Sequence, residues 1–145
     1  MALPQITITP KAAKRLRNFD CWVFTDELSR ADPSLSPGEL VAVVDERGGF
    51  VAYAFYHPRS RIALRVISTV KEQAVDRAWL SQRLTQALAR RRSVSSTNAL
   101  RLVYSEADEL PGLIVDRYAR FLVVQFRSAG MDRLRPVVIE LLQEL

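Results

Sequence analysis

The segment Tyr104-Ser-Glu-Ala-Asp-Glu-Leu-Pro-Gly-Leu-Ile-Val-Asp-Arg-Tyr118 carries the most structural information in this sequence. It places an acidic turn and a Pro-Gly pair before an apolar run, and its Asp-Arg-Tyr corner leads into a second apolar run at residues 121–126. Short apolar runs bounded by turn residues are typical of buried strands. We therefore predict three strands, at residues 100–104, 113–116 and 121–126.

Two helices are predicted to flank these strands. The first covers residues 72–92, where apolar residues recur at the i, i+3, i+4 spacing of an amphipathic helix. The second starts near Gly130, tolerates Pro136 only in its first turn, and keeps an apolar face up to Leu145. Because that face reaches the last residue without a glycine or basic cap, we expect a truncated α/β region; a natural terminal helix is the alternative.

The preceding residues have a mostly β pattern. Ile6 and Ile8 predict a short strand, and Pro10 opens a basic helix over residues 11–17, since proline is tolerated in a first helical turn. Residues 20–25 are expected to be irregular. Three further strands are predicted, with a glycine-containing hairpin turn between the first two: residues 40–44, 50–56 and 61–67.

The predicted fold class is therefore α+β, with a small β-barrel-like domain followed by a mixed α/β region. Apolar residues make up 48% of the 145 residues and charged residues 26%, as in globular proteins. No apolar run approaches the roughly 20 residues of a membrane span, so no membrane partner is expected. One cysteine, Cys21, and one histidine, His57, fit a reducing cytoplasm and argue against a structural zinc site.

No catalytic, cofactor-binding or metal site is predicted. Acidic residues crowd the turn before the Pro-Gly pair, but sequence neighbours on a turn are more often solvated or capping than an acid/base pair. Cys21 lies among Phe19, Trp22 and Phe24, which favours a buried, inert thiol, and His57 is expected to be a surface or capping residue. Glycine-rich phosphate loops are absent from the sequence.

Basic residues favour nucleic acid as a partner, because the net charge is +5 and arginine matches phosphate geometry. Lys11, Lys14 and Arg15 share one helix face, and Arg61 and Arg65 share one side of a strand. Trp22 could stack on a base, although its apolar neighbours favour a core position. Arg90–Arg92 ends a helix, where cations complement the dipole. The predicted RNA-binding residues are Lys11, Lys14, Arg15, Arg17, Trp22, Arg59, Arg61 and Arg65.

Four segments of the chain resemble the N-terminal part of PUA-containing bacterial class I 23S ribosomal RNA cytosine-5 methyltransferases. They are Trp22-Val-Phe24, the stretch 38–66 with Ala54-Phe-Tyr-His-Pro-Arg-Ser-Arg-Ile62, Ser81-Gln-Arg-Leu84, and most specifically residues 105–118. The chain departs from the family at Asp20-Cys21, where His-Pro is common. It also departs at Ala119-Arg120, where a glycine is usual, which argues against a simple positive-φ turn there.

The resemblance implies a PUA RNA-binding pseudo-barrel at residues 1–70 and the start of a connecting α/β domain at residues 71–145. The family's catalytic half binds S-adenosylmethionine and uses a cysteine nucleophile, and no residue of this chain matches those motifs. We therefore expect a cytoplasmic partner of ribosomal RNA that is inactive alone. The alternatives are a stand-alone RNA-binding or ribosome-associated adaptor, and a protein–protein module that forms a homodimer through its last helix.

Overall fold

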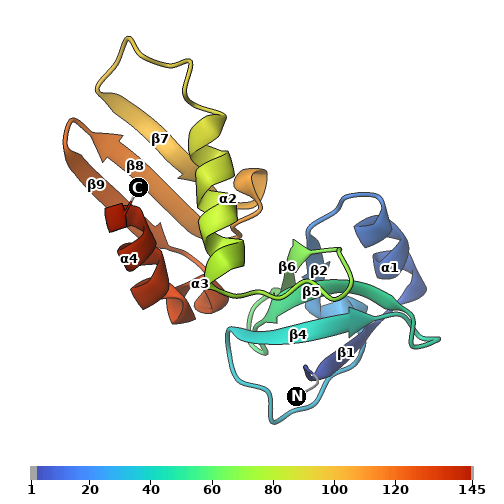
Figure 1. Cartoon of the computed structure of the whole chain (residues 1–145). Coiled ribbons are helices and arrows are strands. Elements are labelled where there is room, and N and C mark those ends of the chain that lie inside the picture. The colour runs from blue at the N-terminus through green and yellow to red at the C-terminus, as the bar shows by residue number, and fades with distance from the viewer. Residues whose placement is uncertain (1–2, 145) are drawn as a thin grey trace. The chain divides into compact units, whose positions relative to one another are not determined.

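The computed structural model describes residues 3–144, which divide into two compact units between Gln73 and Ala74 (Figure 1). We refer to them as the first unit and the second unit. Each unit has its own β-sheet, and each is described by itself.

The first unit is a six-stranded sheet with a helix packed against it. The strand order is β2-β6-β5-β4-β1-β3, and β1 runs parallel to β4 while the other neighbours are antiparallel. The elements are β1 (Gln5–Ile8), α1 (Pro10–Arg17), β2 (Trp22–Phe24), the 3-10 turn η1 (Thr25–Glu27), β3 (Leu28–Arg30), β4 (Glu39–Val44), β5 (Phe50–Tyr56) and β6 (Ile62–Ser68).

This sheet must curl strongly. Strands β2 and β3 lie at its opposite edges, yet only the three residues of η1 separate them in the chain. Neighbouring strands are about 4.8 Å apart, so five gaps of a flat sheet would span about 24 Å, whereas three residues reach about 10 Å. The two edges therefore approach each other in a half-barrel, which confirms the predicted β-barrel-like domain.

The concave side of the half-barrel holds the core of the first unit. Ile6 and Ile8 are fully buried, as their alternation predicts, and Val23, Val41 and Leu64 are buried with them. Helix α1 adds its apolar face to the same cluster through Ala12, Ala13 and Leu16. The basic residues of α1 are consequently directed away from the core.

The predicted strands β1, β4, β5 and β6 are confirmed with boundaries that differ by at most one residue. The expectation of irregular structure at residues 20–25 is wrong, because Trp22–Phe24 forms β2 against β6. Strand β3 was not predicted. Both strands have only three residues, too few for periodicity to show, and their ladders depend on partners far away in the sequence.

The second unit is a three-stranded antiparallel sheet, β7-β8-β9, with helices on one face. The buried residues of this unit include Leu84 and Ala87 of α2, Val138 and Leu141 of α4, and Val115 of the central strand. The predicted three strands are confirmed. The elements are α2 (Arg77–Ala89), β7 (Ala99–Tyr104), η2 (Ser105–Asp108), β8 (Leu113–Tyr118), β9 (Phe121–Phe126), α3 (Ala129–Arg133) and α4 (Arg135–Glu144).

Both predicted helices of this unit differ from the structure. Helix α2 starts later than residue 72, because the Asp76 carboxylate caps it by accepting the Trp79 N–H at 2.9 Å. The last helix is divided at Leu134 into α3 and α4. Pro136 lies in the first turn of α4, the only turn in which the sequence allows it.

The acidic turn before β8 contains a buried carboxylate that forms ion pairs with two arginines. Asp108 is only 3% exposed and pairs with Arg90 and Arg91, at 2.9 and 2.7 Å, while accepting the Tyr104 N–H. Asp116 is likewise buried, and Arg101 binds it through two nitrogens. The expectation that the carboxylates of this turn are solvated or cap a helix is therefore wrong for Asp108. Arg90 and Arg91 supply the positive charges that balance the buried Asp108 carboxylate.

The β8–β9 hairpin turns without a glycine. Ala119 adopts a φ of +53° there, so the expectation that a positive-φ turn is absent is wrong. An alanine in this conformation costs about 1 kcal/mol relative to glycine. Beyond the turn, β9 is an edge strand that exposes Phe121, Leu122 and Val123.

Candidate nucleic-acid interface

Helix α1 separates an apolar face from a cationic one. Thr9 caps the helix by accepting the Ala12 N–H at 3.3 Å, which fixes the residue at which the helix begins. Lys11 and Lys14 are exposed, and in the described part of the chain neither makes an ion pair. Both ammonium groups are therefore available to an anionic ligand.

Arg15 lies in the same helix but has an internal role. Its guanidinium donates to Asp20 at 2.7 Å, to both carboxylate oxygens of Glu27, and to the main-chain oxygen of Trp22 at 3.0 Å. These four hydrogen bonds leave few of its five N–H groups for a ligand. Arg15 therefore ties α1 to β2 and η1, a role that i, i+3, i+4 spacing could not reveal.

The carboxylates in this network are held ionised. Burial alone would raise the pKa of Glu27, but hydrogen bonds from Arg15 and the Phe24 N–H outweigh it and keep that pKa below its usual range. The pKa of Asp20 is also lowered, because the effect of burial is outweighed by hydrogen bonds from Arg15 and from the N–H groups of Trp22 and Cys21. The pKa of Arg15 is raised in turn, chiefly by its hydrogen bond to Glu27.

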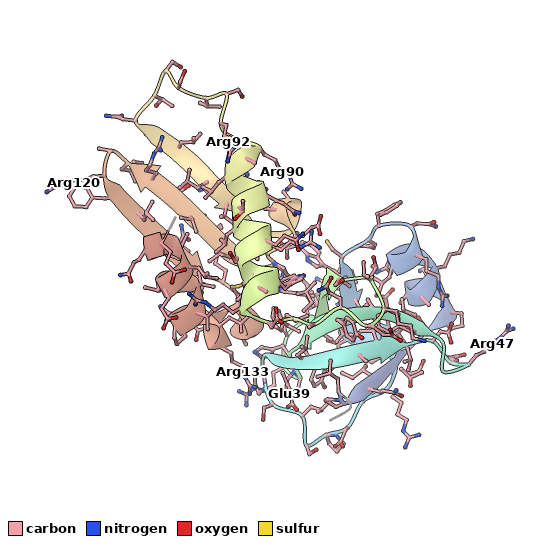
Figure 2. All side chains as sticks on the ribbon, viewed as in Figure 1. Glu39, Arg47, Arg90, Arg92, Arg120 and Arg133 are labelled. Atoms are coloured by element: carbon pink, nitrogen blue, oxygen red, sulfur yellow. The ribbon has the colours of Figure 1, made fainter. Side chains whose placement is uncertain are left out.

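Arg17 joins the end of α1 to the β4–β5 hairpin turn. Its guanidinium lies 2.7 Å from Asp45, and the hydrogen bond from Arg17 lowers the pKa of that carboxyl. Asp45 also orders the turn by accepting the N–H groups of Arg47 and Gly49. Figure 2 shows Arg47 at the tip of this turn, directed away from the sheet.

Trp22 connects α1 to β6. It is half-buried, so the expectation of a core position is wrong, and it pairs with Arg65 in the β2–β6 ladder. The Arg65 guanidinium lies over the indole ring, 5.4 Å from the ring centroid, in a cation–π contact. Arg15, Trp22 and Arg65 therefore form one chain of contacts across β2.

The β5–β6 loop carries the remaining predicted cations. Its backbone is fixed beside η1, because Thr25 donates its N–H to the Arg61 carbonyl at 3.0 Å and its hydroxyl to the Ser60 carbonyl at 2.8 Å. His57 accepts the Arg59 N–H through Nδ1 at 3.2 Å, which confirms its capping role. The side chains of Arg59 and Arg61 are exposed. A hydrogen-bonded backbone thus presents two exposed guanidinium groups, neither of which makes an ion pair within residues 3–144.

The end of α1 holds a residue that the sequence did not indicate. Phe19 has a φ of +68° and donates its N–H to the Leu16 carbonyl, while the Asp20 N–H donates to the Arg15 carbonyl, both at 3.2 Å. This is a Schellman C-cap with phenylalanine at the position that glycine usually takes. The left-handed conformation costs an L-residue about 1–2 kcal/mol.

Phe19 is also 98% exposed. The expectation that it helps to bury Cys21 is therefore wrong, and Cys21 itself is half-buried. The missing glycine after Arg17 is the sequence signal that marks this cap as unusual. In the described part of the chain, no group of three or more His, Cys, Asp or Glu side chains is placed to hold a metal ion.

The first unit matches a known domain family. Residues 6–69 match the family model of a PUA-like domain. The predicted RNA-binding residues all lie within this match.

The whole chain is also similar to part of several bacterial enzymes. It is 35% identical over 144 residues to the ribosomal RNA large subunit methyltransferase I of Enterobacter sp. (strain 638), a match that covers 97% of this chain and 36% of the relative. The Salmonella arizonae enzyme of the same name is 35% identical over 143 residues, again 97% and 36% of the two chains. The chain thus spans about a third of the length of these curated relatives. The similarity supports the resemblance to PUA-containing ribosomal RNA methyltransferases.

Two solved structures share the fold. A candidate SAM-dependent methyltransferase from Streptococcus mutans superposes with a TM-score of 0.85 and 14% identity, over 98% of this chain and 38% of that one. A candidate methyltransferase complexed with SAH gives a TM-score of 0.84, also at 14% identity, over 98% and 37%. Across residues 3–144, no helix combines the length and apolar character needed to cross a membrane.

Proposed function

We propose that this chain is the RNA-binding and linker portion of a SAM-dependent 23S ribosomal RNA cytosine-5 methyltransferase. Residues 1–70 would grip structured ribosomal RNA, and residues 71–145 would begin the connecting α/β domain. Support comes from the PUA-like match over residues 6–69 and from relatives named as ribosomal RNA large subunit methyltransferases.

The exposed cations around β2 carry this proposal. Lys11 and Lys14 lie on the solvent side of α1, and Arg59 and Arg61 lie on a rigid loop beside η1. None of these four is paired with a carboxylate in the described part of the chain, so phosphate would not have to displace an existing partner. Trp22 and Arg65 add a half-buried aromatic–guanidinium pair on β2 and β6.

Arg15 and Arg17 contribute differently from the other predicted residues. Arg15 holds the elements that carry the surface together, and we propose it as a positioning residue. Arg17 is paired with Asp45 but remains half-exposed, so it can share its charge with a phosphate.

Methyl transfer is proposed for the full-length enzyme alone. The relatives extend over about three times the length of this chain, and one structural neighbour holds SAH. We assign no catalytic or cofactor-binding residue to the chain. Its part in the reaction would be to bind RNA so that a target cytosine reaches a separate catalytic domain.

A salt titration of RNA binding tests the proposal. The chain should bind a structured ribosomal RNA fragment in filter-binding assays, with log affinity falling linearly with log salt concentration. Lys14→Glu and Arg61→Glu should each weaken binding and reduce the slope by about one. Arg92→Glu, an equal charge change at an exposed residue of the second unit, is the matched control. Affinity that is independent of salt, or unaffected by both reversals, would contradict the proposal.

A further inference from the structure

The conformation of Phe19 is enforced by its neighbours. The two Schellman hydrogen bonds fix the backbone on either side of it, and the Asp20 carboxylate is tied to Arg15 at 2.7 Å. In most such caps the residues on either side of the turn make an apolar contact, and here that contact is replaced by an ion pair. The backbone at Phe19 is therefore held so that its side chain leaves the fold towards solvent.

Packing does not explain a phenylalanine at this position. Its side chain is 98% exposed and makes no ring contact with another described residue. Glycine would take the same φ without strain. A residue that is both strained and unpacked, yet rigidly held, indicates a role outside the folded chain.

The surroundings of Phe19 favour a polar, anionic ligand with a flat face. The other large apolar side chains exposed in the described first unit are Leu3 and Val70. The helix before Phe19 supplies Lys14 and Arg17, and Arg17 continues to the hairpin turn that carries Arg47. An exposed aromatic ring at the end of a helix that carries exposed cations matches the chemistry of a nucleotide, whose base can stack while its phosphates pair.

We propose that Phe19 is a stacking platform for an unpaired nucleobase of the RNA that binds this unit. The inference rests on the proposed RNA-binding function and adds a residue outside the predicted contact set. The backbone that carries the ring is fixed before RNA binds, so only side-chain freedom is lost on stacking.

Fluorescence and affinity measured on an RNA stem-loop with 2-aminopurine in the loop test this role. Wild-type protein and Phe19→Trp should quench the 2-aminopurine, since both rings can stack. Phe19→Leu and Phe19→Gly should lose the quenching and bind about 5- to 150-fold more weakly, the range that loss of one stacked base produces. Their salt slope should stay at the wild-type value, because phenylalanine contacts no phosphate.

The outcomes separate this inference from the proposed function. Phe19→Gly relieves strain, so a weaker binder that melts at or above the wild-type temperature excludes misfolding as the cause. If the wild type binds the RNA, and Phe19→Leu shows the same affinity and the same quenching, the stacking role alone is overturned. Absence of RNA binding by the wild type would overturn the proposed function itself. Self-association abolished by Phe19→Leu, with RNA binding intact, would assign Phe19 to a protein contact and overturn the inference.

Discussion

Arg15 binds both carboxylate oxygens of Glu27, twelve residues further along the chain, and thereby fixes α1 to the turn that joins the two edges of the curled sheet. The same guanidinium also holds Asp20 and the Trp22 carbonyl. One side chain thus connects the helix that carries Lys11 and Lys14 with the strand that carries Trp22.

Arg15→Ala should destabilise the first unit by about 2–3 kcal/mol, because it leaves a half-buried Glu27 without its cation. Arg15→Lys should recover only part of this loss, since an ammonium has three N–H donors and lacks the planar fork that makes the four hydrogen bonds of Arg15. The unit can be followed separately, because Trp22 lies in the first unit and Trp79 in the second. Urea unfolding in a Trp79→Phe background, in which Trp22 is the remaining tryptophan, measures the change in the unfolding free energy of the first unit. Lys14→Ala, one residue away and exposed, should change the stability by less than about 0.5 kcal/mol.

Stability of the first unit should decrease at acid pH. The pKa values of Asp20 and Glu27 are lowered in the folded protein, so their contribution is complete above their unfolded pKa of about 4 and is lost as pH falls through the folded values. The unfolding free energy should therefore fall between about pH 5 and pH 2. Glu27→Gln should flatten this dependence, whereas Glu46→Gln, which removes an exposed carboxylate, should not. A dependence that is equally steep in both variants would exclude Glu27 as its source.

Asp108→Ala should be among the most damaging substitutions in the second unit. It leaves Arg90 and Arg91 without their carboxylate and frees the Tyr104 N–H, for a loss of about 3–5 kcal/mol. Thermal unfolding followed by Trp79 fluorescence in a Trp22→Phe background measures the change. Asp132→Ala is the matched control, because its pair with Arg135 is exposed and should contribute less than about 1 kcal/mol. Equal effects of the two substitutions would show that burial of Asp108 is unimportant.

Ala119→Gly should stabilise the second unit by about 1 kcal/mol, since glycine adopts a φ of +53° without the steric cost of a β-carbon. Ala119 is exposed, so no packing is lost. The reverse is expected for Ala99→Gly in β7, an exposed strand position where glycine costs about 0.5–1 kcal/mol. Melting temperatures of the two variants should move in opposite directions.

Periodicity predicted the parts of the fold that repeat locally. Strand β1 alternates through Ile6 and Ile8, and α1 places Ala12, Ala13 and Leu16 on one face, so both could be read from short windows. Strands β2 and β3 are too short for this, and they exist because residues far away pair with them. The boundary of α2 depended on one cap, Asp76, that the apolar pattern does not contain.

The candidate site was predictable in its composition but not in the roles of its residues. The basic character of α1 is evident from the sequence, yet only the structure distinguishes the exposed Lys14 from the internal Arg15. The burial of Trp22 and Phe19 was predicted wrongly for the same reason, because residues far away in the sequence decide it. A neighbouring apolar residue in the sequence does not guarantee a neighbouring apolar residue in space.

The ladder between β2 and β6 has a consequence for the order of folding. Trp22 pairs with Arg65, whereas β4, β5 and β6 follow one another through short turns. Closing a long loop carries an entropic penalty before its contacts form, so we expect the β4–β5–β6 meander to form first and β2 to join late. During synthesis, the N-terminal segment with α1 and Phe19 leaves the ribosome before the strand that completes its sheet has been made. The part of the proposed RNA-binding surface that α1 and β2 carry is therefore expected to be the last part of the first unit to assemble.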